Sequence, residues 1–225
     1  MPQTARPADV LSVEQIAGRL AEKNAQRDAA LKSYESRREM TVAVKSRMGD
    51  AGATETVVMT FTAPATKRFA VVSATGSAFI RQSVFQKAIS SEQAAADPIA
   101  KQGAALTLAN YDMRLAGQER LDIGLCYVLD VLPKTTSAFA YRGRVWIQDT
   151  DFAVVKIDGQ PAQDPSAWVS GGKFITYFQK VGDFYFPKET TSSSQILMGG
   201  DASLTIKYGE YRILQADPVR TAALR

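Results

Sequence analysis

The chain has 225 residues, of which 45% are hydrophobic, so it can bury a sizeable core. Its 27 Lys and Arg residues exceed its 23 Asp and Glu residues by a net charge of only +4, and the basic residues are scattered. A nucleic-acid-binding protein usually concentrates them on one face, so we expect no nucleic acid as a partner. No run of apolar residues reaches the ~18 of a membrane-spanning helix, which predicts a protein peripheral to any membrane.

The sequence contains no histidine and one cysteine, Cys126. The commonest general base, the Ser-His and Cys-His nucleophile pairs and every histidine-containing metal site are therefore excluded. Cys126 lies between apolar neighbours in a strand pattern, which is typical of a buried structural thiol. We expect no catalytic activity, no cofactor and no metal.

Two short motifs resemble catalytic patterns. Ser170 and Lys173 have the S-x-x-K spacing of serine acyltransferases, but two glycines separate them and a strand pattern follows instead of a helix. Asp149 and Asp151 have the spacing of an acid–base pair, but they occupy a turn between two strand patterns, where aspartate is favoured for its backbone hydrogen bonds. A structural role is the better explanation for both.

The first predicted element is a helix from Val13 to about Leu31. Ser12 and Gln15 have the spacing of a capping box, and an apolar stripe follows them. Residues 1–10 are polar and contain proline, which predicts a flexible lead.

Alternating apolar and polar residues then predict a meander of three strands between Tyr34 and Ala74, and Pro64 ends the second of them. The period changes from Ser77 to Ala96, where apolar residues recur every three or four positions, as in an amphipathic helix. Asp97-Pro98 ends that helix, and a less regular stretch is predicted up to Gly103.

Further strands are predicted in the second half of the chain, joined mostly by short turns. They are Ala105–Leu115, Leu121–Leu132, Ala138–Gln148, Phe152–Asp158, Lys173–Lys180, Phe184–Leu197 and Ala202–Leu214. Residues 116–119 form a predicted turn, residues 159–170 a long loop with Trp168, and Gly209 a bulge.

These elements predict an α+β chain: a strongly curved, half-open antiparallel β-barrel of about ten or eleven strands, with the Val13–Leu31 and Ser77–Ala96 helices covering its concave face. We expect a single domain over residues 11–214, followed by a tail over 215–225.

Five segments also resemble a known family. They are LSVEQIAGRLAEKNAQRDAALKSYESRREM, ANYDMRLAGQERLDIGLCYVLDVLPK, YRGRVWIQDTDFAVVKIDGQPA, ITYFQKVGDFYFPKET and LTIKYGEYRI. Together they resemble the outer-membrane lipoprotein-sorting family of exported bacterial proteins, which has the LolA-like fold. The segment RGRVWIQDTDFAVVKIDG is the most specific, and it is a signature of the fold.

The resemblance implies a periplasmic or cell-envelope protein whose signal peptide has been removed. It implies a hydrophobic ligand, either lipid acyl chains or an acylated lipoprotein, held in the concavity under helices that act as a lid. A related group uses the same fold in envelope-stress sensing, so the alternative is a protein-interaction module with an envelope partner and no lipid cargo.

Ten apolar residues are the predicted contacts of such a ligand. The helices supply Phe79, Val84, Phe85 and Ile89, and the inward faces of the strands supply Met40, Val42, Met59, Phe61, Leu125 and Tyr127. A continuous apolar cavity would favour carriage. A packed interior would favour the interaction module, with the 159–170 loop around Trp168 as its candidate surface.

Overall fold

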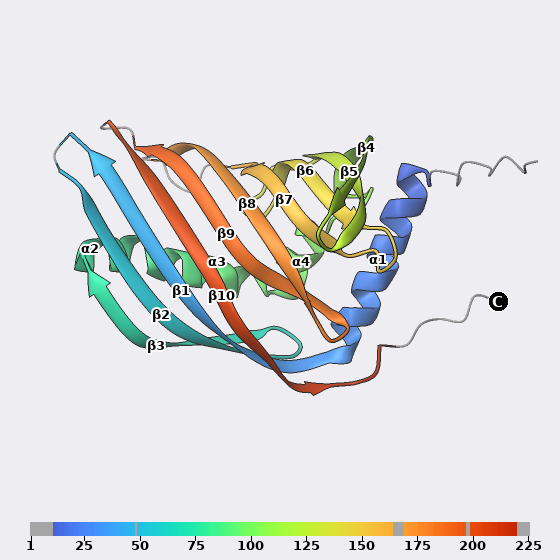
Figure 1. Ribbon diagram of the computed structural model, residues 1–225, viewed down its shortest axis with the longest axis horizontal. Coiled ribbons are helices and arrows are strands. Elements are labelled where there is room, and N and C mark those ends of the chain that lie inside the picture. The colour runs from blue at the N-terminus through green and yellow to red at the C-terminus, as the bar shows by residue number, and fades with distance from the viewer. Residues whose placement is uncertain (1–10, 48, 164–168, 197–198, 220–225) are drawn as a thin grey trace, which may run out of the picture.

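The computed structural model describes residues 11–47, 49–163, 169–196 and 199–219. It contains a ten-stranded antiparallel sheet in the order β3-β2-β1-β10-β9-β8-β7-β6-β5-β4. The sheet curves strongly and does not close, because its edge strands β3 and β4 pair with no further described strand (Figure 1). The half-open sheet predicted from the sequence is therefore present.

The strands and helices have the following bounds. The strands are β1 Leu31–Ser46, β2 Ala51–Thr62, β3 Thr66–Gly76, β4 Tyr111–Leu121, β5 Gly124–Pro133, β6 Tyr141–Gln148, β7 Val154–Pro161, β8 Val169–Val181, β9 Phe184–Ile196 and β10 Gly200–Ala216. The helices are α1 Val13–Ala30, α2 Ala78–Ile80, the π-helical turn η1 Arg81–Phe85, α3 Gln86–Ala95 and α4 Pro98–Ala104. No described helix is long and apolar enough to cross a membrane.

Helix α1 begins where the sequence predicts. The Ser12 hydroxyl accepts a hydrogen bond from the Gln15 N–H, and the Gln15 side chain accepts one from the Ser12 N–H, so the capping box is complete. Ile16 and Leu20, on one side of the helix, are fully buried against the β4–β7 end of the sheet. This end of the concave face is the α1 cluster, with Tyr111, Tyr127, Leu129, Val131, Val145, Ile147 and Phe152.

One row of directly paired residues crosses the sheet and shows that both helical covers lie on the same face. Paired residues of an antiparallel sheet point to the same side. From β2 to β4 the row is Glu55, Met40, Ile206, Thr190, Thr176, Ile157, Val145, Leu129 and Leu115. Its β4 end packs against α1, and its β2 end lies under η1 and α3. Figure 1 shows α2, α3 and α4 running together across the concave side.

The segment between α3 and β5 differs from the prediction. Residues 98–104 form the helix α4, because the Asp97 carboxylate caps the N–H groups of Ile99 and Ala100 and proline is suited to the first helical turn. The strand predicted from Ala105 begins only at Tyr111. The turn predicted at 116–119 lies inside β4, where Gly117 forms a bulge, and the hairpin turns at residues 122–123.

Two further boundaries are also corrected. The loop predicted for 159–170 is shorter, because β7 extends to Pro161 and β8 begins at Val169; Trp168 lies outside the described residues. Strand β10 continues to Ala216, into the predicted tail. The bulge predicted at Gly209 is confirmed, since the register between β1 and β10 shifts between the Ser36–Tyr211 and Arg38–Tyr208 pairs. Residues 1–10 and 220–225 lie outside the described part of the chain.

Cys126 is expected to be unreactive in the folded protein. Its side chain is fully buried beside Val128 and Trp146, and this burial raises the pKa of the thiol to about 11. Because the thiolate is the reactive species, an aromatic disulfide reagent at pH 8 should label no thiol in the native protein and one thiol per chain in urea. Rapid labelling without denaturant would contradict the burial.

Candidate functional site

The candidate site is an apolar cluster between the sheet and the helical segment α2–η1–α3. Ile80, Phe85 and Ile89 project from one side of that segment. They pack on residues of β1 and β2, and together these buried residues form the α3 cluster. Its sheet members are Met40, Val42, Ala53 and Val57, with Val44, Phe69, Val84, Leu204 and Ile206 partly buried around them.

The structure brings half of the ten predicted contact residues into this cluster: Met40, Val42, Phe85 and Ile89 as buried members and Val84 at its edge. Met59 and Phe61 lie in a neighbouring cluster with Tyr34 and Phe186, and Tyr127 lies in the α1 cluster. Leu125 is half-buried opposite Arg120 of the edge strand β4. Phe79 lies on the outer side of its helix and is 77% exposed.

A buried ion cluster also holds α3 on the sheet. Glu92 of α3 forms ion pairs with Arg38 of β1 and with Lys67 of β3, the latter at 2.7 Å. The Arg38 side chain is only 5% exposed and lies over the rings of Phe69 and Tyr208. Glu92 follows Phe85 and Ile89 at helical spacing, so the same side of the helix carries the apolar contacts and the ion pairs.

The electrostatics of this cluster favour its charged state. Burial alone would raise the pKa of Glu92, but the nearby positive charges of Arg38 and Lys67 outweigh it and hold that pKa below the ordinary value. Burial alone would lower the pKa of Arg38, but the charge of Glu92 raises it. A charged group this far from water is tolerated only with such partners.

Hydroxyl groups line the concave face between the two helical covers. Thr176 of β8 and Thr190 of β9 face each other with their hydroxyl oxygens 2.9 Å apart. Ser192, two residues further along β9, donates to the Leu204 carbonyl of β10. The concave face is therefore apolar beneath α1 and beneath α3 and more polar in between. This division runs across the strands, so the sequence of any one strand does not reveal it.

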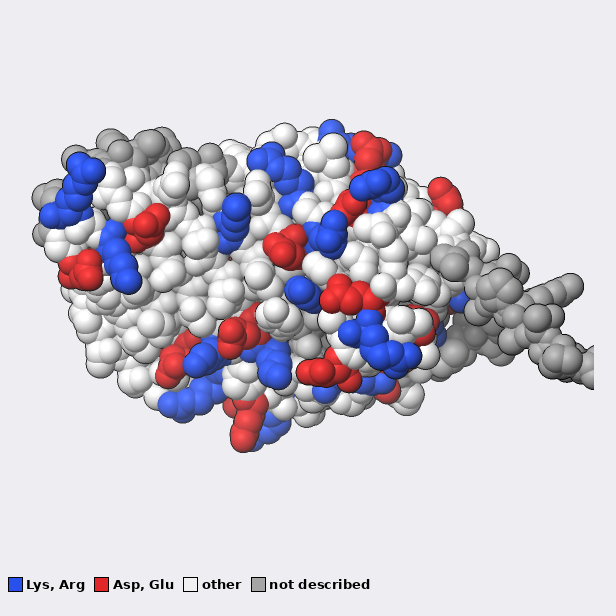
Figure 2. All heavy atoms as spheres, turned by 45° about the horizontal axis from the view of Figure 1, so that its top comes forward, with Lys and Arg blue, Asp and Glu red and all other residues white. Residues whose placement is uncertain are grey.

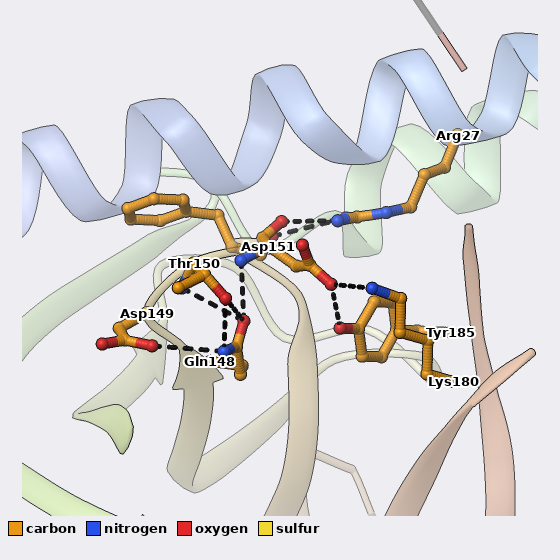
Figure 3. A network of polar contacts seen from close by, with 8 residues as sticks. Arg27, Gln148, Asp149, Thr150, Asp151, Lys180 and Tyr185 are labelled. Atoms are coloured by element: carbon orange, nitrogen blue, oxygen red, sulfur yellow. Dashed lines mark hydrogen bonds and ion pairs between the residues drawn. The ribbon is translucent and has the colours of Figure 1, made fainter. Parts of the chain in front are cut away.

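A second polar network fixes α1 to the other end of the sheet (Figure 3). Arg27 of α1 donates to the carbonyls of Asp151 and Phe152 in the β6–β7 turn, and its guanidinium lies over the Tyr185 ring. The Asp151 carboxylate accepts hydrogen bonds from Lys180 and Tyr185. Asp151, rejected above as a catalytic acid, thus joins the turn to β8 and β9.

The turn itself is held in an unusual conformation. Phe152 has φ = 45°, a value that non-glycine residues rarely adopt. The Gln148 side chain accepts from the N–H groups of Thr150 and Asp151 and so supports the turn from below (Figure 3). Arg19 of α1 lies over the Phe152 ring at 5.2 Å. The hairpin RGRVWIQDTDFAVVKIDG, the segment with the most specific family resemblance, therefore contains the residues to which α1 is attached.

Asp151→Asn is expected to destabilise the protein by about 1–2 kcal/mol at pH 7 by weakening the bonds to Lys180 and Tyr185. Burial tends to raise the pKa of Asp151, but its hydrogen bonds and nearby cations outweigh burial and hold the pKa below the ordinary 3.8. This stabilisation is therefore complete above that ordinary value and is lost as the pH falls through the lower, folded-state pKa.

Urea unfolding of the Asp151→Asn variant and the wild type at a series of pH values measures this difference. Asp149→Asn is the matched control, because the Asp149 carboxylate accepts a hydrogen bond from Gln148 and an asparagine oxygen can still accept that bond. An Asp151→Asn effect that is equally large at the lowest pH would contradict the assignment.

The opposite, convex face carries an open groove of about 490 Å³ over β5–β8. Arg142, Arg144 and Lys173 line it together with Asp130, Asp158 and Trp146. Figure 2 shows basic and acidic side chains interspersed on the surface in view. Within the described residues, no three His, Cys, Asp or Glu side chains come together in a way that could hold a metal ion.

Comparison with solved structures finds LolA-like proteins among the similar chains. A DUF1329 family protein from Desulfovibrio piger is 12% identical, with a TM-score of 0.44 over 90% of this chain and 93% of its own. A putative outer membrane lipoprotein-sorting protein domain from Vibrio parahaemolyticus is 10% identical, with a TM-score of 0.41 over 88% and 92%. A LolA superfamily protein from Nitrosomonas europaea is 12% identical, with a TM-score of 0.38 over 88% and 93%.

These neighbours include the group that the sequence resembles. No protein-family model matches the chain, and no curated protein does.

Proposed function

We propose that this chain is a non-catalytic binding or carrier protein of the bacterial envelope, and that it holds a hydrophobic ligand against its concave face. The ligand class is lipid acyl chains, free or attached to a lipoprotein. The observation that carries the proposal is the α3 cluster, in which the helical segment α2–η1–α3 covers a row of apolar strand residues.

The two helical covers differ in how they are held. Helix α1 is bound to the β6–β7 turn through Arg27, and it packs on the α1 cluster, which shares no residue with the α3 cluster. The α2–η1–α3 segment is held by its apolar side and by the Glu92 ion pairs. Its π-helical turn is a local irregularity of a kind that is frequent at functional sites. We therefore assign the movable cover to α2–η1–α3 and the fixed one to α1.

The burial of an acyl chain can offset the loss of the apolar contacts between the helix and the sheet. Removing Phe85 and Ile89 from their contacts costs about 1.5–3 kcal/mol for each side chain. An acyl chain that buries about ten methylenes gains about 8 kcal/mol. The apolar part of the exchange is therefore favourable, while the Glu92 ion pairs oppose the lifting of the helix and reduce the free energy left for binding.

A tether between the two covers tests the proposal. Lys101 of α4 forms an exposed ion pair with Asp28 of α1, and replacing both residues by cysteine places two accessible thiols there while Cys126 stays buried. A short bismaleimide should then join α4 to α1. The untethered variant should take up a fluorescent fatty acid as the wild type does, and the tethered one should lose uptake. Equal uptake with and without the tether would refute the movable cover.

A protein-interaction module is the second candidate, and two observations favour it. The buried members of the α3 cluster are packed, as expected for an interior that holds no cargo. The convex groove also offers exposed cations beside Trp146. Affinity capture from envelope extracts with the wild type and an Arg142→Glu, Lys173→Glu variant tests it. A partner that only the wild type retains, together with no lipid uptake, would replace the carrier proposal.

A further inference from the structure

The α3 cluster contains one carboxylate among its apolar residues. Glu55 lies on the concave face of β2, between Ala53 and Val57 and directly opposite Met40 of β1. All three of these neighbours are buried members of the α3 cluster. The register therefore places the Glu55 side chain on the surface that the helical segment covers.

Glu55 is 4% exposed, and its Oε1 atom has no hydrogen-bond partner within the described chain. The charged side chain that acts on it electrostatically is Arg81, the first residue of the π-helical turn. The Arg81 Nε atom is also buried without a partner. An unused acceptor on the sheet thus occurs together with an unused donor on the helix that covers it.

This arrangement contrasts with that of Glu92, an acid on the helical segment itself. Glu92 has two cationic partners within hydrogen-bond distance, and they lower its pKa after outweighing burial. Burial instead raises the pKa of Glu55, because the attraction of Arg81 only partly opposes it. Buried polar groups are nearly always paired, and one left unpaired is costly to the fold.

We propose that Glu55 and Arg81 bind the polar head of the ligand and select an acyl chain that ends in an amide. The proposal deepens the proposed function and rests on it. An amide N–H can donate to the Glu55 carboxylate while the amide carbonyl accepts from the Arg81 Nε–H, so one neutral group satisfies both atoms. The chain of such a ligand would then lie along the apolar residues that flank Glu55.

Other head groups satisfy only one of the two residues. A fatty acid carboxylate pairs with Arg81 but is repelled by Glu55, and an alkyl ammonium pairs with Glu55 but is repelled by Arg81. In a site shielded from water, such a mismatch lowers the affinity strongly, because a buried polar group is left without a partner. The site should therefore prefer a fatty amide over the acid and the amine of equal chain length.

Competition among hexadecanamide, hexadecanoic acid and hexadecylamine tests the head-group site. The full chain is first loaded with phenylnaphthylamine, an uncharged fluorescent probe, at pH 7.5. Each ligand is then added, and the displacement of the probe gives its affinity. The wild type should bind the amide about tenfold more tightly than the acid or the amine. Glu55→Met, which keeps the length of the side chain and removes its charge, should lose this preference and bind the acid more tightly than the wild type does.

Glu39→Met is the matched control, because Glu39 lies on the exposed, opposite side of β1 and should leave all three affinities unchanged. Thermal unfolding verifies that each variant folds. Glu55→Met should unfold no lower than the wild type, since it removes a buried carboxylate whose Oε1 atom has no hydrogen-bond partner among the described residues. Equal affinities of the wild type for the three ligands, or an unchanged preference in Glu55→Met, overturn the head-group site alone. If none of the three ligands displaces the probe, the proposed function is overturned as well.

Discussion

Glu92→Ala is expected to lower the free energy of unfolding by about 3–5 kcal/mol, the usual effect of removing one partner from a buried ion pair. The change leaves the Arg38 guanidinium, which is 5% exposed, without an acid on the helix above it. Helix α3 loses both links to β1 and β3 at once. Urea denaturation at pH 7 measures the loss.

Two controls test whether the loss arises because the Arg38 charge is buried, and not simply because an ion pair is removed. Arg212→Ala removes an exposed ion pair with Glu35 and should cost less than about 1 kcal/mol. Glu92→Ala combined with Arg38→Met, which removes both buried charges, should be less unstable than Glu92→Ala alone, because no unpaired guanidinium remains. Additive effects of the two substitutions would show that the residues do not act as a pair.

Phe85→Ala is expected to destabilise the protein by about 3–5 kcal/mol, as is typical when a large aromatic side chain is deleted from a core. Phe85 is fully buried at the centre of the α3 cluster, where it contacts residues of the helix and the sheet. The cavity would lie between the movable cover and the sheet. The same variant should therefore increase the initial uptake of a hydrophobic probe.

Phe79→Ala is the matched control, since it removes the same side chain from the preceding turn of the same helical segment. Phe79 is 77% exposed, so its removal should change the stability by less than about 0.5 kcal/mol. Comparable losses for Phe79→Ala and Phe85→Ala, measured by thermal or urea unfolding, would mean that the outward and inward sides of this segment are assigned wrongly.

The strand pattern could be predicted well where one face of a strand is buried and the other is exposed. Met40 and Val42 share their parity with the other inward residues of β1, and the predicted meander of β1 with β2 is present. The pairing of β1 with β10 was not predicted, because parity does not show which distant strand lies beside β1. Residues 105–110 are not a strand, although their apolar residues alternate as those of a strand do. They instead connect α4 to β4, and the Asn110 side chain donates to the Gln102 and Ala105 carbonyls there.

The ion cluster could not be derived from the sequence. Arg38, Lys67 and Glu92 belong to three different elements, and a local sequence pattern does not show how distant elements pack together. One signal was nevertheless present. Arg38 and Glu55 stand at positions whose parity points to the apolar face, where a charge needs a partner. A charged residue within an otherwise apolar parity is therefore a useful marker of a cross-element contact or of a ligand.

Native mass spectrometry of the full chain purified from bacterial envelopes, with lipid identification after solvent extraction, tests most directly whether the concave face binds a hydrophobic ligand. The account predicts a bound acyl-chain compound on part of the population. Once this compound has been removed, protein in which α4 is tethered to α1 should take up no replacement. A protein that carries no bound compound, and that gains none when mixed with hexadecanamide or phospholipid vesicles, would contradict it.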